Sequence, residues 1–178
     1  MNPEELIKKY YAENPDAFDK LMVHSTMVKN KALKVVDDHP ELLADREFVE
    51  SAAMLHDIGI IFTNAPSIGC NGSWPYIAHG HLGAELLRKE GYPFHARVCE
   101  RHTGTGLTRE EVVNQNLPIP PSRYVPETIE ELIICYADKF YSKGDLTYEH
   151  SVDEVLQNLS RYGEDKNETF LKWHEMFK

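Results

Sequence analysis

Cysteine is scarce in this sequence. The three cysteines, Cys70, Cys99 and Cys135, lie far apart and form no CxxC pair, which excludes a disulfide framework and is typical of reduced thiols. No apolar run approaches the length that crosses a membrane, and the first residues lack the basic and apolar regions of a signal peptide. We therefore expect a cytoplasmic protein that has no membrane contact.

Basic clusters are also missing. The chain has 19 Lys and Arg against 29 Asp and Glu, a net charge of −10, and no group of cations that could follow a phosphate backbone. Long nucleic acid is therefore not an expected partner. A Gly-x-Ser-x-Gly nucleophile turn and a phosphate-binding glycine loop are absent too. An acidic protein can still bind a small anion where metal cations reverse the local field.

Apolar residues recur at three- and four-residue spacing almost throughout the chain, which is typical of helices with one buried face. Asn2, Asn14 and Asp45 are suited to cap the first helices. Further helices are expected at about 79–90, just after Pro93, over 127–141, and as a covering layer within 151–177. The 178 residues, without repeat or linker, predict one all-α domain over 1–178, a helical bundle with its motif-bearing core at about 18–141.

An apolar helical run from Ala52 to Leu55 leads directly into His56 and Asp57, and Gly59 ends the run. The apolar residues indicate that this stretch is buried. Buried ionisable groups are costly unless they are paired or bound to a metal. The pair therefore suggests a metal site, and the alternative is a core histidine that is hydrogen-bonded to its neighbouring carboxylate.

Other histidines and aspartates border the predicted buried faces. They are His24, His79 or His81, His102 and Asp138. Each of them alone is more often a satisfied polar residue at the edge of a core. Together with the His-Asp pair they form a set suited to a metal bound between bundled helices. Mixed imidazole and carboxylate ligands favour Fe, Mn or Zn.

A long segment from Ile60 to Tyr76 follows the His-Asp pair and is rich in Gly, Pro, Asn and Ser. Such composition predicts an irregular loop, and a loop of this length in a compact domain is commonly functional. We expect it to form a lid or a wall of a substrate pocket, and a plain surface loop is the alternative. Its aromatic residues, Trp74 and Tyr76, could stack on a base or pack the loop down.

The order of these motifs, H…HD…H…H…D, resembles the HD-domain superfamily of metal-dependent phosphohydrolases. Residues 55–59 match its signature, and the stretches 78–87, 100–104 and 136–139 look like the subgroup with two metals. That subgroup includes the bacterial symmetrical dinucleoside tetraphosphate hydrolases. The resemblance covers about 24–141, most of the chain, and it implies a fold with the metal site between helices.

The resemblance also implies a ligand set, which surrounds two divalent ions. His24, His56, Asp57 and Asp138 would hold a first metal, and Asp57 would bridge to a second ion held by His79 and His102. His79 is preferred to His81 because it stands in the family's relation to Gly83 and Ala84. His81 would then at most contact the substrate or support a ligand. Fe or Mn is the first expectation for the ions, with Zn, Co or Ni as further options.

One position departs from the pattern. Two-metal members often carry a lysine where this chain has Ile60, so a cationic phosphate contact is missing. Arg101 or Lys139, each beside a matched ligand, could replace it, although either could equally be a solvated surface charge. The candidate catalytic residues are thus Asp57, Arg101 and Lys139.

The function implied by the resemblance is hydrolysis of a small phosphate ester, a nucleotide or dinucleotide, by metal-activated water. The candidate substrate contacts are Trp74, Tyr76 and His81. Two alternatives stay open. Some proteins of this fold with the same ligand set are mixed-valence diiron oxygenases, and others could bind nucleotides without catalysis. The expected partner is a small phosphorylated molecule, and a homodimer stays open.

Overall fold

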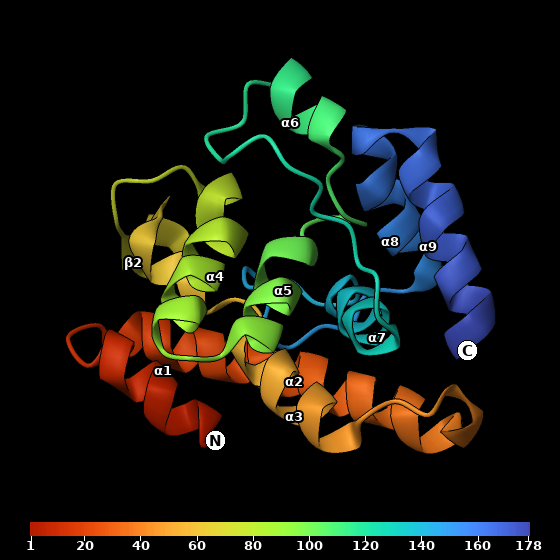
Figure 1. The fold of residues 1–178 in the computed structure, drawn as a ribbon, viewed down its shortest axis with the longest axis horizontal. Helices are drawn as coiled ribbons and strands as arrows, with labels where there is room; N and C mark the ends of the chain where they lie inside the picture. Colours follow the sequence, from red (N-terminus) through yellow and green to blue (C-terminus); the bar gives the residue numbers. More distant parts are fainter.

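The computed structural model describes residues 1–178, and the protein is built almost entirely of helices (Figure 1). The helices are α1 (Pro3–Tyr11), α2 (Pro15–Asp38), α3 (Arg46–Leu55), α4 (His79–Lys89), α5 (Pro93–Arg101), α6 (Arg109–Asn114), α7 (Ile129–Asp138), α8 (Val152–Leu159) and α9 (Glu164–Phe177). The single sheet pairs two short antiparallel strands, β1 (Asn64–Ala65) and β2 (Cys70–Asn71). The predicted all-α bundle is confirmed. None of the helices combines the length and the apolarity that crossing a membrane requires.

The first helices begin where their capping residues predict. Asn2 accepts a hydrogen bond from the backbone N–H of Glu5, and Asn14 accepts one from Ala17. Asp45 caps α3 in the same way. These side chains satisfy backbone donors that the first turn of a helix leaves free.

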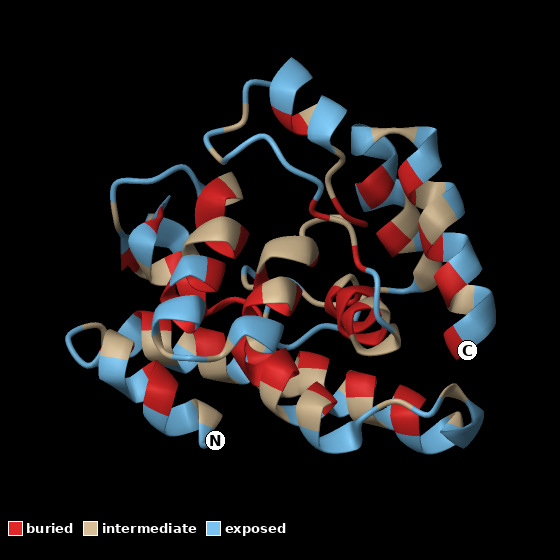
Figure 2. Ribbon diagram, in the orientation of Figure 1, coloured by how far each residue is buried: buried red, intermediate tan, exposed pale blue.

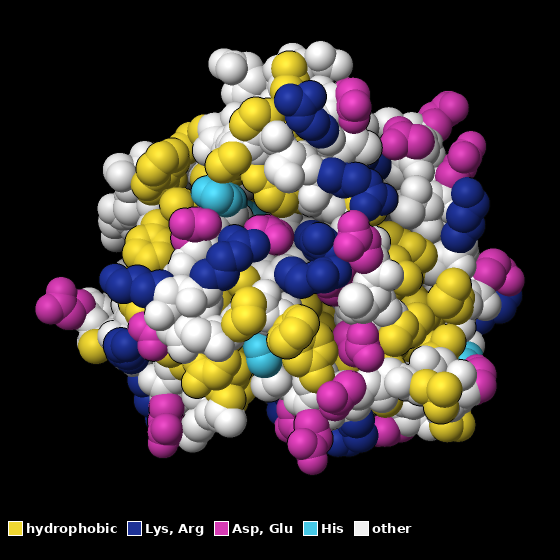
Figure 3. Space-filling view, viewed as in Figure 1, with side chains coloured by type: hydrophobic (Ala, Val, Ile, Leu, Met, Phe, Trp, Pro, Cys, Tyr) yellow, Lys and Arg dark blue, Asp and Glu magenta, His cyan; other side chains and the backbone are white.

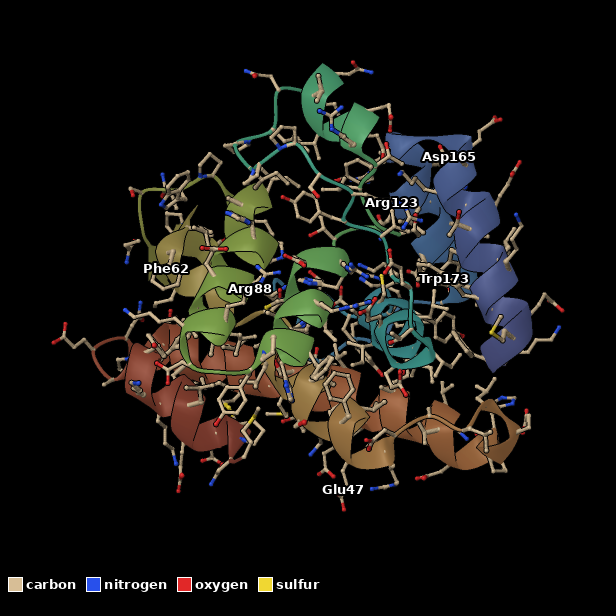
Figure 4. The ribbon with its side chains drawn as sticks, viewed as in Figure 1. Glu47, Phe62, Arg88, Arg123, Asp165 and Trp173 are labelled. Atoms are coloured by element: carbon tan, nitrogen blue, oxygen red, sulfur yellow. The ribbon has the colours of Figure 1, made fainter.

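Helix α7 is the centre of the larger core. It is buried almost all round, and in Figure 2 it appears nearly continuously red between α5 and α9. One hydrophobic cluster joins it to Val28 and Ala32 of α2 and to Phe170 and Trp173 of α9. Figure 4 shows Trp173 on the side of α9 that faces α7. The C-terminal helices therefore cover α7, as the sequence predicts, and hold its last residue, Asp138, deep in the protein.

A second hydrophobic cluster lies under the turn that follows α3. It joins α1, α2, α4 and α5 to the short 3-10 helix η2 (Ile58–Phe62). The Tyr11 hydroxyl of α1 donates to the carbonyl of Ile58 at 2.8 Å and accepts from the amide of Ile61 at 3.3 Å. The thiol of Cys99 donates to the carbonyl of His56 at 2.9 Å. These bonds fix the backbone on both sides of Asp57.

Gly59 lets η2 lie directly against the first turns of α4. A Cβ at this position would overlap the carbonyl oxygen of His79 and the backbone of Gly83. The absence of a side chain therefore sets the distance between the His-Asp turn and the start of α4. This contact places His79 beside Asp57.

Replacing Gly59 by alanine is expected to destabilise the fold by about 1–3 kcal/mol, because the added methyl group meets backbone rather than a flexible side chain. Urea denaturation followed by circular dichroism measures the change. Gly144→Ala is the matched control, since only the Ser142 hydroxyl lies near its Cβ position, at 3.5 Å. Equal unfolding midpoints for the two variants would contradict the close approach.

Candidate metal centre

Side chains from five helices converge at one buried point. His24 comes from the middle of α2, His56 and Asp57 follow the end of α3, and His79 begins α4. His102 follows the end of α5, and Asp138 is the last residue of α7. All six are buried, and none exposes more than 9% of its surface. The structure thus brings together every residue of the predicted ligand set.

The first group surrounds one oxygen of each aspartate. Asp57 Oδ2 lies 3.1 Å from His24 Nε2 and 3.0 Å from His56 Nε2. Asp138 Oδ1 lies 3.1 Å and 3.3 Å from the same two nitrogens. The ligand atoms of these four residues are all within 4.8 Å of one another. Two imidazoles and two carboxylates are a donor set that suits Fe, Mn or Zn.

The second group uses the other oxygen of Asp57. Asp57 Oδ1 lies 3.3 Å from His79 Nε2 and 3.2 Å from His102 Nε2. The two imidazole nitrogens are 3.1 Å apart. Asp57 is therefore the one residue shared by both groups. A carboxylate with one oxygen toward each group is suited to bridge two ions.

Helix ends orient the imidazole rings. Nδ1 of His56 lies 2.7 Å from the carbonyl oxygen of Ala53, and Nδ1 of His102 lies 2.7 Å from that of Cys99. Nδ1 of His79 lies 2.6 Å from the carbonyl oxygen of Tyr76. A carbonyl only accepts, so each Nδ1 carries a proton, and each Nε2 is the nitrogen that would offer its lone pair to a cation at the centre.

Several polar atoms that face the centre form no hydrogen bond of acceptable geometry within the protein. His56 Nε2 and both carboxylate oxygens of Asp57 are buried without a hydrogen bond of acceptable geometry, although the Lys143 ammonium lies 2.6 Å from Asp57 Oδ2. Unpaired buried polar atoms cost free energy. In the second group, two lone pairs face each other across 3.1 Å, which is repulsive unless a cation lies between them. The residues present therefore fit divalent cations in both groups.

Burial and charge set the protonation of the site. Burial lowers the pKa of His56, but Asp57 and Asp138 outweigh it and raise the pKa to about 10. Burial lowers the pKa of His102 to about 4. Burial raises the pKa of Asp57, yet Lys143 and His56 hold it well below its usual range. At physiological pH His102 is therefore neutral and Asp57 is ionised, whereas His56 keeps its second proton until a bound cation displaces it.

Two lysines lie against the carboxylates. Lys139 Nζ is 2.8 Å from Asp138 Oδ2 and donates to the carbonyl of His102 at 3.1 Å. Lys143 Nζ is 2.6 Å from Asp57 Oδ2. Lys143 is absent from the sequence-based candidates, because it follows the end of the predicted helix and helical spacing does not relate it to Asp138. The one sequence feature that points to such a residue is the absence of a cation at Ile60, which implies a replacement from elsewhere in the chain.

A cleft of about 1070 Å³ opens beside the centre. Its lining includes the ligand-group residues His79 and Asp138 and both Lys139 and Lys143. Tyr76 also lines it, with its ring stacked on the His79 imidazole at 4.6 Å between centroids. The remaining walls include the segments 65–68, 103–107 and 141–145 and residues of α6, α8 and α9. Part of the predicted loop is thus a wall of the cleft.

Three predicted site residues lie elsewhere. Trp74 is 46% exposed and is not among the residues that line the cleft. His81 lies on α4 outside the cleft and outside both ligand groups. Arg101 pairs with Glu127 at 2.7 Å and with Glu131 at 3.2 Å. Roles for these three in binding or catalysis stay predictions that the geometry does not favour.

The surface carries no broad basic area on the face seen in Figure 3. Acidic side chains are spread around its rim, and basic ones cross its middle among neutral atoms. Several of the cations are paired, such as Arg88 with Glu100 at 2.6 Å. This distribution fits the net charge of −10.

Comparisons with known proteins agree with this geometry. The family described as HD domain matches residues 21–142. Among solved structures, the HD domain of the L. monocytogenes phosphodiesterase PgpH superposes with a TM-score of 0.56 at 18% identity, over 97% of this chain and 94% of that one. The same domain in complex with cyclic-di-AMP gives a TM-score of 0.56 at 19% identity. At these identities the likeness concerns the fold.

Curated relatives are longer than this chain. It is 34% identical over 173 residues to a protein of Thermoplasma volcanium named tRNA (cytidine(56)-2'-O)-methyltransferase, covering 96% of this chain and 44% of that protein. A protein of the same name from Picrophilus torridus is 39% identical over 132 residues, 74% of this chain and 33% of the relative. An uncharacterized protein of Methanocaldococcus jannaschii is 33% identical over 135 residues, which are 75% of this chain and 65% of that protein. The chain spans less than two thirds of each.

Proposed function

The chain belongs to the HD-domain family, and from that premise we propose that it is a metal-dependent phosphohydrolase acting on a nucleotide or dinucleotide. The observation that carries the proposal is the pair of buried ligand groups that share Asp57 beside a cleft lined by lysines. Divalent ions held there would activate a water molecule and neutralise charge on a phosphoryl group.

The chain's own residues supply the remaining requirements. Burial of the six ligands excludes bulk water from the carboxylates and imidazoles. Lys139 holds the Asp138 carboxylate and the backbone of His102, so it orients one ligand of each group. The lysines also place positive charge on the cleft wall of a protein whose net charge is −10. A phosphate ester can therefore approach where the rest of the surface repels it.

A nucleotide is the favoured substrate class for two reasons. The cleft is large enough for a base and ribose as well as a phosphate, and Tyr76 offers an aromatic face in its wall. Two relatives, of which the chain covers 44% and 33%, are named for 2'-O-methylation of a cytidine in tRNA, and one structural neighbour is described in complex with cyclic-di-AMP. These names support a ribonucleotide without specifying which one.

A substrate panel tests the proposal. Metal-free protein is reconstituted separately with Mn, Fe, Co and Zn and incubated with p-nitrophenyl phosphate, bis(p-nitrophenyl) phosphate, nucleotides and dinucleotides. We expect hydrolysis that requires metal and stops on chelation. Metal analysis of the purified protein is run beside the panel.

The same panel separates the competing functions. Consumption of dioxygen with iron alone, without release of phosphate or nucleotide, would indicate an oxygenase. Tight nucleotide binding without turnover in any metal form would indicate a binding protein. Either result would contradict hydrolysis.

The aromatic contacts can be distinguished by a matched pair of variants. Tyr76→Ala is expected to raise KM by about tenfold, because stacking of an aromatic side chain on a base contributes about 1–3 kcal/mol. Trp74→Ala is expected to leave KM nearly unchanged, since Trp74 lies outside the cleft lining. Metal content is measured for both. A larger rise in KM for Trp74→Ala than for Tyr76→Ala would indicate that Trp74, and not Tyr76, contacts the substrate.

A further inference from the structure

We propose that Lys143 is the residue that binds the phosphoryl group of the substrate, in the role that the sequence leaves empty at Ile60. The inference rests on the proposed function and deepens it by naming the cation. Lys143 lies one residue beyond the segment that matches the family, in the turn that follows α7. Ile60 itself is fully buried in the cluster beneath the site, so that position offers nothing to the cleft.

The position of the ammonium group is the first observation. Lys143 Nζ lies 2.6 Å from Asp57 Oδ2, the oxygen that also faces His24 and His56. Its side chain is 13% exposed, and the residue lines the cleft. Lys143 therefore stands at the boundary between the ligand groups and the space that a substrate would occupy.

The number of donors that remain available is the second observation. A lysine ammonium has three N–H donors. Lys139 uses two of its donors within the protein, in hydrogen bonds to Asp138 and to the His102 carbonyl. Lys143 has a single anionic partner, Asp57. It therefore keeps donors for a phosphate oxygen, whereas Lys139 acts on the ligands.

The other cations near the cleft are either paired with other groups or form no ion pair with the shared carboxylate Asp57. Lys166 pairs with Glu111 at 2.5 Å and donates to the carbonyl of Gly106 at 3.3 Å. Arg101 pairs with two glutamates and lies outside the cleft lining. Arg161 lines the cleft but forms no ion pair with a ligand carboxylate. Lys143 is the cation that both lines the cleft and contacts the shared carboxylate.

Metal binding would strengthen this role. A divalent cation beside Asp57 repels an ammonium group and competes with it for the carboxylate. The Lys143–Asp57 pair should therefore weaken when the site is loaded, which releases Nζ toward an anion in the cleft. In the metal-free protein the same ammonium offsets the charge of the buried Asp57.

The test measures binding of inorganic phosphate by calorimetry to protein reconstituted with Mn and freed of excess metal. Lys143→Met is expected to weaken phosphate binding by about 10- to 100-fold, the loss that follows from removing a hydrogen bond to a charged group. Lys143→Arg is expected to restore most of the affinity, because it keeps the charge and the donors. Manganese content should stay at the wild-type level. Lys34→Met, which removes an exposed lysine paired with Asp38, is the matched control.

A second measurement uses the wild-type protein and does not depend on the folding of a variant. Phosphate should slow acetylation of Lys143 in the Mn-loaded protein, as read by peptide mass spectrometry, and leave acetylation of Lys34 unchanged. Equal phosphate affinity of wild type and Lys143→Met, or absence of protection at Lys143, would overturn the inference. The substrate panel decides the proposed function separately: phosphate binding through Lys143 without hydrolysis would support the inference and contradict the function.

Discussion

Replacing Asp57 by alanine is expected to abolish binding of both metal ions and to lower hydrolysis of a phosphate ester by about 10³-fold or more. The reason is geometric. Oδ2 faces His24 and His56, and Oδ1 faces His79 and His102, so one side chain serves both ligand groups. Elemental analysis after reconstitution, together with initial rates, measures both effects.

The control for this variant is Asp37→Ala, which removes an exposed carboxylate paired with Arg46 at the far end of α2. It should keep full metal content and activity. Circular dichroism of Asp57→Ala checks that the helices are retained, since Lys143 loses its anionic partner in this variant. An Asp57→Ala protein that folds, binds two ions and hydrolyses the substrate would refute the shared-ligand arrangement.

Much of the fold was predictable because local signals agree with the tertiary structure. Asn14 and Asp45 mark helix starts through a hydrogen bond that involves only the next few residues. The apolar stripe that includes Val28 and Ala32 marks the face of α2 that enters the main core. Such signals depend on spacing along one helix, which the sequence shows directly.

The grouping of the candidate ligands was predictable for a different reason. His56, Asp57 and Asp138 are polar residues at the ends of strongly apolar helices, where burial makes an unpaired charge costly. His102 follows α5, a more polar helix whose buried residues are Ala96, Val98 and Cys99. The motif order then grouped these residues through resemblance to a family. The distances that divide them into two groups required the structure.

Contacts between distant segments were beyond the sequence. Lys143 reaches Asp57 because the chain turns back after α7, and nothing in the spacing of the two residues indicates this. Arg101 adjoins a ligand in sequence, yet its side chain points to Glu127 and Glu131. Adjacency along the chain identified a cation near the site but not the direction of its side chain.

The close approach of η2 and α4 is another contact between distant segments that the sequence does not predict. Gly59 was expected only to end a helix, whereas it also allows the backbone contact that sets His79 beside Asp57. Packing of one backbone on another leaves no periodic signal. It becomes visible only when both elements are placed.

Replacing His102 by alanine is expected to remove one metal ion and leave the other bound. His102 contributes only to the second group, with Asp57 and His79, whereas the first group keeps all four of its residues. His79→Ala should give the same stoichiometry, although it also removes the ring on which Tyr76 stacks. Turnover should fall by about 10²- to 10³-fold in both variants, because in the proposed mechanism one of the two charges that would neutralise the phosphoryl group is lost.

His81→Ala is the matched control for these variants, because it removes an imidazole from the same helix as His79 and lies outside both groups. It should retain two ions under saturating Mn or Fe. His24→Ala makes the complementary measurement, since it weakens the first group and spares the second. Two separable losses, one from each side of Asp57, would establish two sites. One ion in the wild-type protein, with His79→Ala and His102→Ala fully active, would instead establish a mononuclear hydrolase built on α2, α3 and α7.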